Sequence, residues 1–307
     1  MPSRPAQNGS QAYSFAHADN SRHSGAVDIR FSDDPGAFAT LAAEFMKADP
    51  FSTNVIGVHS SGVVAGLRPG GPEDIWAVIL EQKRVIGVAM QTPPYNLFVS
   101  RMPAEAAHRL ADAVDGVGRT IPGVSGETTA VSAFLDRWAE LRGEVPSGEV
   151  AMRMYRLGRL RHPSGVVGEA RPAGRDDAGV IRDWFAAFQA EAQRDGPAHD
   201  AASIADRRVA AGEVTLWARA GEPVSMAACS PPAGGVARVG PVYTPPAHRR
   251  HGFGAAVTAG ATAQALEKGA VHVVLYTDLA NPTSNSVYRS IGYLADHDAV
   301  ERRFAGQ

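Results

Sequence analysis

The segment of residues 237–264 restricts the possible folds of this chain most, because its residue types change from strand to turn to helix within a short distance. Residues 237–242 are apolar and β-prone, and the pair Pro245-Pro246 ends that run. A basic turn of residues 248–251 follows, and Gly252-Phe253-Gly254 then opens an alanine-rich stretch that is typical of a helix. The segment therefore predicts a strand, a glycine turn and the start of a helix in direct succession.

This succession is typical of a site that binds an anion. The first backbone N–H groups of a helix have no partner within the helix, and the macrodipole adds partial positive charge there. Gly252 and Gly254 have no Cβ, so a phosphate can come close to the main chain. A tight turn that only starts an amphipathic helix uses glycines in the same way, and this segment alone leaves both interpretations open.

Two common phosphate-binding motifs are excluded. The dinucleotide fingerprint needs a third glycine at the position where Val257 stands. The ATP-type loop needs Gly-Lys followed by Ser or Thr, and the chain has no such run. The phosphate ligand, if one binds, belongs to another class.

A second pattern lies near the C-terminus. Residues 271–277 are a continuous β-prone run, as expected for a strand that is buried on both faces. After this run, Asn281, Asn285 and Tyr288 stand at i, i+4 and i+7, which predicts that they share one face of a helix. Gly292 then stands where a glycine would end that helix.

Together the two patterns resemble the signature segments of the GNAT acetyltransferase family. The first is Arg-x-x-Gly-x-Gly at residues 249–254, and the second is Asn-x-x-x-Asn-x-x-Tyr-x-x-x-Gly-Tyr at residues 281–293. The resemblance implies an α+β (α/β GNAT) fold, with a mixed, mostly antiparallel twisted sheet flanked by helices and with strands 4 and 5 splayed apart. Pro241 cannot donate a hydrogen bond to a sheet, so it fits a splayed point, and it would also fit a bulge in an edge strand.

The resemblance also implies acetyl-CoA (coenzyme A) as cosubstrate. The implied contact residues are Val242, Tyr243, Thr244, Arg249, Arg250, His251, Gly252, Phe253, Gly254, Ala255, Asn281, Asn285 and Tyr288. In this interpretation the loop amides bind the diphosphate, and main-chain groups of the preceding strand bind the pantetheine. Asn281 hydrogen-bonds the cofactor or a bridging water, and His248 adds positive charge beside the two arginines.

By the same resemblance, Tyr288 holds the position of the general acid. A thiol has a pKa of about 8.5 and a tyrosine of about 10, so the tyrosine can return a proton to the leaving thiolate. The alternative is a helix tyrosine that packs on the sheet with a bonded hydroxyl.

The general base is unassigned. An alkyl amine has a pKa of about 10.4 and must lose a proton before it attacks a thioester. Many relatives carry a carboxylate for this purpose, but residues 237–242 have none, and the next strand offers only His272 and Asp278. A water chain, or deprotonation in solution, would also serve.

Other polar and aromatic candidates have simpler explanations. We expect Trp184 and Phe188 to be core residues, although either could contact the acceptor. Glu191 and Asp195 could attract an amine, but a solvated helix end accounts for them more simply. Cys229 is the only cysteine, which excludes an intrachain disulfide, and we expect it to pack as a small core residue.

A weak internal repeat indicates a tandem architecture. Two strand-like runs, with a tryptophan in the first and a Pro-Pro pair after the second, occur at residues 75–94 and again at residues 214–232. The predicted units are a flexible tail (residues 1–26), a degenerate GNAT-like domain (27–160) and a catalytic GNAT domain (167–307). The first copy has no glycine turn before its predicted helix at residues 104–114, so we assign no cofactor residue to it. It either walls the acceptor cleft or only stabilises the second copy.

Composition limits the possible partners. With 44% hydrophobic residues and a net charge of −2, the chain can build a core and has no basic footprint for nucleic acid or for an anionic membrane. No apolar run is long enough to span a membrane, so we expect a cytoplasmic protein. The sequence indicates no metal site, and the protein could be a monomer or a homodimer. The expected function is acetyl-CoA-dependent N-acetylation of a primary amine, on a small molecule or a peptide. The alternative is a non-catalytic CoA or acyl-CoA sensor.

Overall fold

A computed structural model describes residues 27–192 and 201–304. The predicted tail, residues 1–26, lies outside the described residues. The first half contains β1 (Val27–Ser32), α1 (Pro35–Ala48), α2 (Asn54–Val64), β2 (Ile75–Glu81), β3 (Arg84–Gln91), β4 (Leu97–Val99), α3 (Ala104–Gly116), β5 (Gly123–Glu127), α4 (Thr128–Arg142) and β6 (Pro146–Leu157). The second half contains β7 (Glu169–Pro172), α5 (Ala178–Glu191), α6 (Ala201–Ala210), β8 (Val214–Arg219), β9 (Glu222–Cys229), β10 (Val236–Tyr243), α7 (Phe253–Glu267), β11 (His272–Asp278), α8 (Pro282–Ser290) and β12 (Tyr293–Phe304), with short 3₁₀ helices at Arg175–Asp177 and Pro246–His248.

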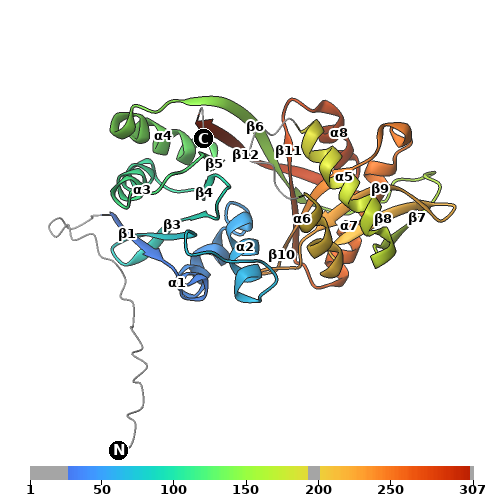
Figure 1. The fold of residues 1–307 in the computed structure, drawn as a ribbon, viewed down its shortest axis with the longest axis horizontal. Helices are drawn as coiled ribbons and strands as arrows, with labels where there is room; N and C mark the ends of the chain where they lie inside the picture. Colours follow the sequence, from blue (N-terminus) through green and yellow to red (C-terminus); the bar gives the residue numbers. More distant parts are fainter. Residues whose placement is uncertain (1–26, 193–200, 305–307) are drawn as a thin grey trace, which may run out of the picture.

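The two halves repeat the same order of strands and helices, and their strands join one twelve-stranded sheet (Figure 1). The strand order is β1-β2-β3-β4-β5-β12-β6-β11-β10-β9-β8-β7, in which each strand of the first half has its counterpart at the mirrored position. Only β4–β5 and β10–β11 pair in parallel, and the other neighbours are antiparallel. The predicted fold class and the internal repeat are therefore confirmed.

The two halves exchange their last strands. The predicted first unit (27–160) includes the residues of β6, but β6 lies between β11 and β12 of the second half. In turn β12 pairs with β5 of the first half, and Figure 1 shows β6 and β12 side by side where the halves meet. Sequence periodicity could not predict this exchange, because it identifies a strand but not the strand's neighbour.

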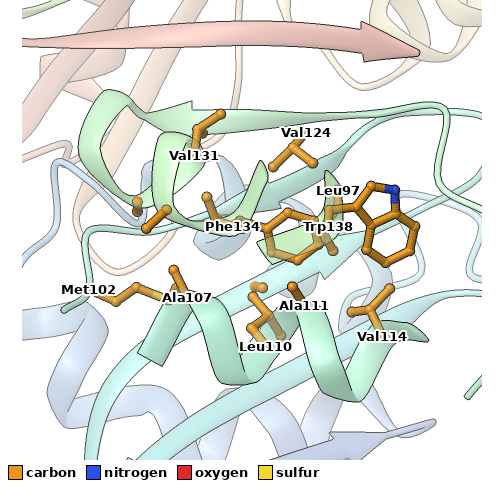
Figure 2. Close-up of a cluster of buried hydrophobic side chains, with 14 of the residues drawn as sticks. Leu97, Met102, Ala107, Leu110, Ala111, Val114, Val124, Val131, Phe134 and Trp138 are labelled. Atoms are coloured by element: carbon orange, nitrogen blue, oxygen red, sulfur yellow. The ribbon is translucent and has the colours of Figure 1, made fainter. Parts of the chain in front are cut away.

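The two cores on the side of the sheet covered by α3, α4, α7 and α8 therefore contain side chains from both halves. Val300 and Phe304 of β12 pack into the first half's core with residues of α3 and α4, part of which Figure 2 shows. Tyr155 of β6 packs into the core between the second half's sheet and α7 and α8. The opposite face of the sheet is covered by α1 and α2 in the first half and by α5 and α6 in the second.

Local signals start the helices where the sequence predicts them. Asp34 accepts a hydrogen bond from the Gly36 N–H at 2.7 Å and Pro35 follows it, so α1 begins with a capped first turn. At the other end of the chain, α8 stops at Ser290 and Gly292 has φ +101°, as expected for a glycine just beyond a helix. The strands β1, β5 and β12 and the helix α2 were not predicted.

The sheet opens between β10 and β11. Their parallel pairing begins at Val236 and ends at Val239, which lies opposite Leu275. On its other side β10 stays paired with β9, with a register shift between Val239 and Val242. Because β10 is an interior strand, the edge-strand interpretation of Pro241 is wrong, and the predicted splay and a bulge occur together.

Phe304 tests the strand exchange, because it belongs to the last strand of the chain but lies in the core of the first half, 6.2 Å from the Trp138 ring. We predict that Phe304→Ala lowers the free energy of unfolding by about 3 kcal/mol, since it leaves a cavity beside α4. Circular dichroism and tryptophan fluorescence should then report one shifted transition. Leu294→Ala, at a half-exposed position of the same strand, is the control. Two separate transitions, with the first half unaffected, would contradict the exchange.

Candidate functional site

The glycine turn lies at the open end of β10. Gly252 has φ +80° and caps the N-terminus of α7, and Arg250 also has a positive φ of 65°. The Ala256 N–H bonds the Gly252 carbonyl at 3.0 Å, so the helix hydrogen bonds start there and leave the N–H groups of residues 253–255 for another acceptor. A Cβ on Gly254 would lie 3.4 Å from Thr244 Oγ1, so space beside the main chain is limited. This geometry suits a phosphate at the head of α7.

The helix behind this turn is held firmly. Most residues of α7 are buried, including Phe253 and Ala255 of its first turn. The Thr258 hydroxyl donates to the Gly254 carbonyl at 2.7 Å, and Thr262 shares a hydrogen bond of 2.7 Å with Tyr293. A rigid helix keeps its first amides fixed, which is what an anion site needs.

Arg249 is bonded within the protein. Its guanidinium donates to both carboxylate oxygens of Glu191 at 2.6 and 2.7 Å, and its Nε donates to the Thr244 carbonyl at 2.9 Å. The Tyr243 hydroxyl donates to the same Glu191 carboxylate at 3.1 Å. Glu191 thus lies at the exposed end of α5, as expected, and is also paired with Arg249, whereas Asp195 lies outside the described residues.

A matching ion pair occurs in the first half. Arg101 follows β4 as Arg249 follows β10, and it pairs with Asp49 at the end of α1 at 3.2 Å. Since the first half has no glycine turn, this pair has a role that does not depend on a phosphate. We infer that Arg249 mainly ties the loop to α5, while Arg250 and His251 are exposed beside the turn.

The predicted asparagine–tyrosine face is formed by α8. Asn281 caps the helix through a hydrogen bond of 3.0 Å from the Ser284 N–H. Asn285 is buried, donates to the Asp278 and Asn281 carbonyls at 2.9 and 2.7 Å, and accepts from the Tyr155 hydroxyl at 2.8 Å. Both amides thus hold α8 in place, and one of their partners comes from the exchanged strand β6.

Tyr288 is the exception on this face. Its ring lies 6.5 Å from that of Tyr155 and 6.3 Å from that of Tyr293, and only 9% of the residue is exposed. No group within residues 27–192 and 201–304 hydrogen-bonds its hydroxyl. Burial raises the pKa of Tyr288 to about 12, so it is protonated at neutral pH. The alternative interpretation required a hydrogen-bonded Tyr288 hydroxyl, and none of the described residues provides that bond.

The two candidate bases both have contacts within the protein. His272 packs edge-on against Phe51 of the first half at 5.0 Å, and Asp278 accepts from the Ala280 N–H at 2.7 Å. Cys229 packs against the core of the second half, and burial raises its pKa to about 12, so it is no nucleophile. In the part of the chain that the structure describes, no cluster of His, Cys, Asp and Glu could hold a metal ion.

The sequence analysis missed residues of α2 that reach this region. Asn54 donates to the Tyr276 hydroxyl of β11 at 2.9 Å, and α2 packs against β10. Burial raises the pKa of Tyr276 to about 12. No sequence signal marked α2, because its apolar residues lack the spacing of one buried stripe.

Comparison with known proteins agrees with this geometry. Residues 179–293 match the model of the Acetyltransferase (GNAT) family. An acetyltransferase from the GNAT family of Colwellia psychrerythraea has a similar structure, with a TM-score of 0.54 and 13% identity over 90% of this chain and 99% of that one. A Drosophila protein has a TM-score of 0.65 and 13% identity, over 90% and 98% of the two chains. A tandem GNAT protein from the clavulanic acid biosynthesis pathway has a TM-score of 0.50 and 12% identity, over 92% and 99%.

At these identities the solved structures establish the fold alone. They cover both halves of this chain, which agrees with the repeat seen in the sheet. No curated protein matches the chain in sequence. No helix within the described ranges is long and apolar enough to cross a membrane.

Gly252 tests the anion site. We predict that Gly252→Val raises the Kd for acetyl-CoA at least about tenfold in calorimetry, because a side chain there would block the main chain and meet Val166 at 3.0 Å. Gly221→Val is the matched control, since Gly221 has a similar φ of 87° in the turn between β8 and β9 with open space around it. Equal Kd values for both variants would contradict the site.

Proposed function

We propose that the second half transfers an acetyl group from acetyl-CoA to a primary amine by direct attack. The match of residues 179–293 to the model of the Acetyltransferase (GNAT) family supports this proposal. One observation carries the proposal: the β10–β11 pairing stops at Val239, and the helices that follow these two strands carry complementary groups. The helix after β10 begins at a glycine cap, and the helix after β11 carries a buried, protonated tyrosine with no bonded partner among the described residues. A diphosphate needs the first feature, and a leaving thiolate needs the second.

The acyl carrier would bind along this gap. Backbone amides of residues 250–255 would hold the diphosphate, with Arg250, His251 and His248 adding positive charge. Beyond Val239, the edge of β10 that faces β11 has no partner in that strand. Main-chain groups of Val242 and Thr244 can therefore pair with the amides of the pantetheine, as a further strand would.

The transfer needs two proton movements. The amine nitrogen forms a bond to the thioester carbon, the carbon–sulfur bond breaks, and the acetylated nitrogen gives up a proton to water or to a base. The Tyr288 hydroxyl gives its proton to the departing sulfur and recovers one from solvent. A tyrosine with a pKa of about 12 is a weak acid for a free thiolate, but removal from water raises the pKa of a thiol as well.

A second candidate function is binding without turnover. One observation favours it, namely the lack of an evident general base on β10 and β11. Among the described residues of these strands the candidates are His272, which packs on Phe51, and Asp278, which accepts a hydrogen bond from a backbone N–H. Release of free CoA thiol in the presence of an amine panel separates the two functions. Binding of acetyl-CoA without thiol release would favour the sensor.

Tyr288 tests the chemistry. We predict that Tyr288→Phe lowers kcat by about 100-fold or more and leaves the Kd for acetyl-CoA within about threefold, because the hydroxyl acts on the leaving group. The stability should change little, since no described residue bonds this hydroxyl.

Tyr293→Phe is the control for that variant. Its hydroxyl is bonded to Thr262 at 2.7 Å in the core, so its loss should lower the Tm without lowering kcat. An unchanged kcat in Tyr288→Phe, measured by thiol release, would remove Tyr288 from the mechanism.

A further inference from the structure

A buried charged cluster lies where the first half meets the second. It contains Arg68, which follows α2, together with Arg208 of α6 and Glu213, which precedes β8. The exposed fractions of these side chains are only 12%, 11% and 7%. His59 of α2 lies beside them, and we call these four residues the junction cluster.

The junction cluster is on the acceptor side of the sheet. Arg208 donates to the Gly240 carbonyl at 2.9 Å, at the residue that directly follows the last β10–β11 pair. Along β10, Ala237 and Val239 point into the core with α7, so Arg238 between them faces the opposite side. There α2 packs against β10, and Arg208 and Arg238 are both near enough to affect His59. The cluster therefore faces away from α7 and α8.

The described residues do not satisfy the hydrogen-bonding groups of this cluster. Glu213 is 3.7 Å from Arg208 and 4.0 Å from Arg68, and both contacts are too long for hydrogen bonds. The Arg208 Nε and the Glu213 Oε2 are buried without a hydrogen-bond partner. A buried guanidinium that lacks full pairing is costly.

Among the described side chains of this region, positive charges outnumber negative ones. Burial lowers the pKa of His59 to about 3, and the next causes are the positive charges of Arg68, Arg238, Arg208 and Arg207. His59 is therefore neutral at pH 7 and adds no charge. Burial also lowers the pKa of Arg208, to about 10, so this residue stays charged. Among the described groups, two buried arginines share one carboxylate.

We propose that the junction cluster binds an anionic group, in the simplest case a carboxylate, on the amine acceptor itself. This inference rests on the proposed acetyl transfer. An anion held by Arg68 and Arg208 would lie beside the opening at Gly240, on the face opposite Tyr288. The amine of the same molecule could then reach the thioester through the gap between β10 and β11. The acceptor class is thus a primary amine with a negative charge a few bonds away.

The first half then has a direct role in selecting the acceptor. Arg68 and His59 belong to that half, which lacks a glycine turn of its own. Its α2 helix would supply one wall of the acceptor side. Gly62 of α2 allows the Arg68 side chain to lie against this helix, since a Cβ on residue 62 would be 2.6 Å from Arg68 Cδ. The degenerate half would bind the acceptor while the second half binds the acyl carrier.

Matched acceptor pairs test this inference on the unmodified protein. With acetyl-CoA, kcat/KM should be at least about tenfold higher for β-alanine than for β-alaninamide, or for phosphoethanolamine than for ethanolamine. The pair that responds identifies the anion as carboxylate or phosphate. Equal values within both pairs, with thiol release intact, would overturn the inference and leave the proposed function standing.

Variants of Arg68 give the second test. Arg68→Gln should abolish the preference for the anionic acceptor, Arg68→Lys should restore part of it, and the exposed Arg84→Gln should keep it. The Kd for acetyl-CoA should stay unchanged in all three. A lower Tm with an unchanged preference would make Arg68 purely structural and would contradict the inference.

A third measurement is independent of turnover. Acetate or phosphate at millimolar concentration should raise the Tm of the wild-type protein but not that of Arg68→Gln. If acetyl-CoA neither binds nor releases thiol, the proposed function fails, and this anion effect still decides whether the cluster binds an anion. Equal shifts in both proteins would overturn it.

Discussion

The end of the β10–β11 ladder at Val239 is the constraint on which the site depends. Up to that residue the sheet is closed and α7 packs on a continuous surface. Beyond it β10 follows β9 alone, and its other edge becomes available to a ligand. The same opening lies next to the head of α7 and next to the Gly240 carbonyl that Arg208 holds. Groups on both faces of the sheet therefore lie close to this one interruption of the hydrogen-bonded ladder.

The exchange of β6 and β12 explains why the two halves work as one unit. Tyr155 reaches from the first half's last strand to Asn285, which in turn holds α8 and therefore Tyr288. Phe304 reaches from the second half's last strand into the first half's core. Neither half has a complete core without the other, so the second half cut at residue 167 would lose a central strand of its sheet.

Much of the second half could be predicted from the sequence, because its signals are local. The glycine turn and the glycine after α8 each follow from a residue type that only certain backbone conformations favour. The strand exchange and the junction cluster could not be predicted, because both depend on contacts between residues far apart in the chain. Arg68 and Glu213, for example, are brought together only when α2 packs on β10.

Two motif residues make contacts in the structure that differ from the cofactor contacts that the resemblance implies. Arg249 belongs to the loop motif, yet its guanidinium is engaged by Glu191, and Arg101 makes the corresponding contact without any glycine turn. Asn281 belongs to the second motif, yet its side chain caps α8. In both cases a motif residue builds the frame of the site, and backbone amides are left as the groups that can bind the phosphate.

Hydrogen exchange of the backbone amides, with and without acetyl-CoA, tests the central claim most directly. If the head of α7 binds the diphosphate, amides of residues 250–255 should exchange more slowly in the presence of acetyl-CoA. The corresponding amides of residues 101–107 at the head of α3 should not change. Unchanged exchange at residues 250–255, or equal protection at both helix heads, would contradict the account.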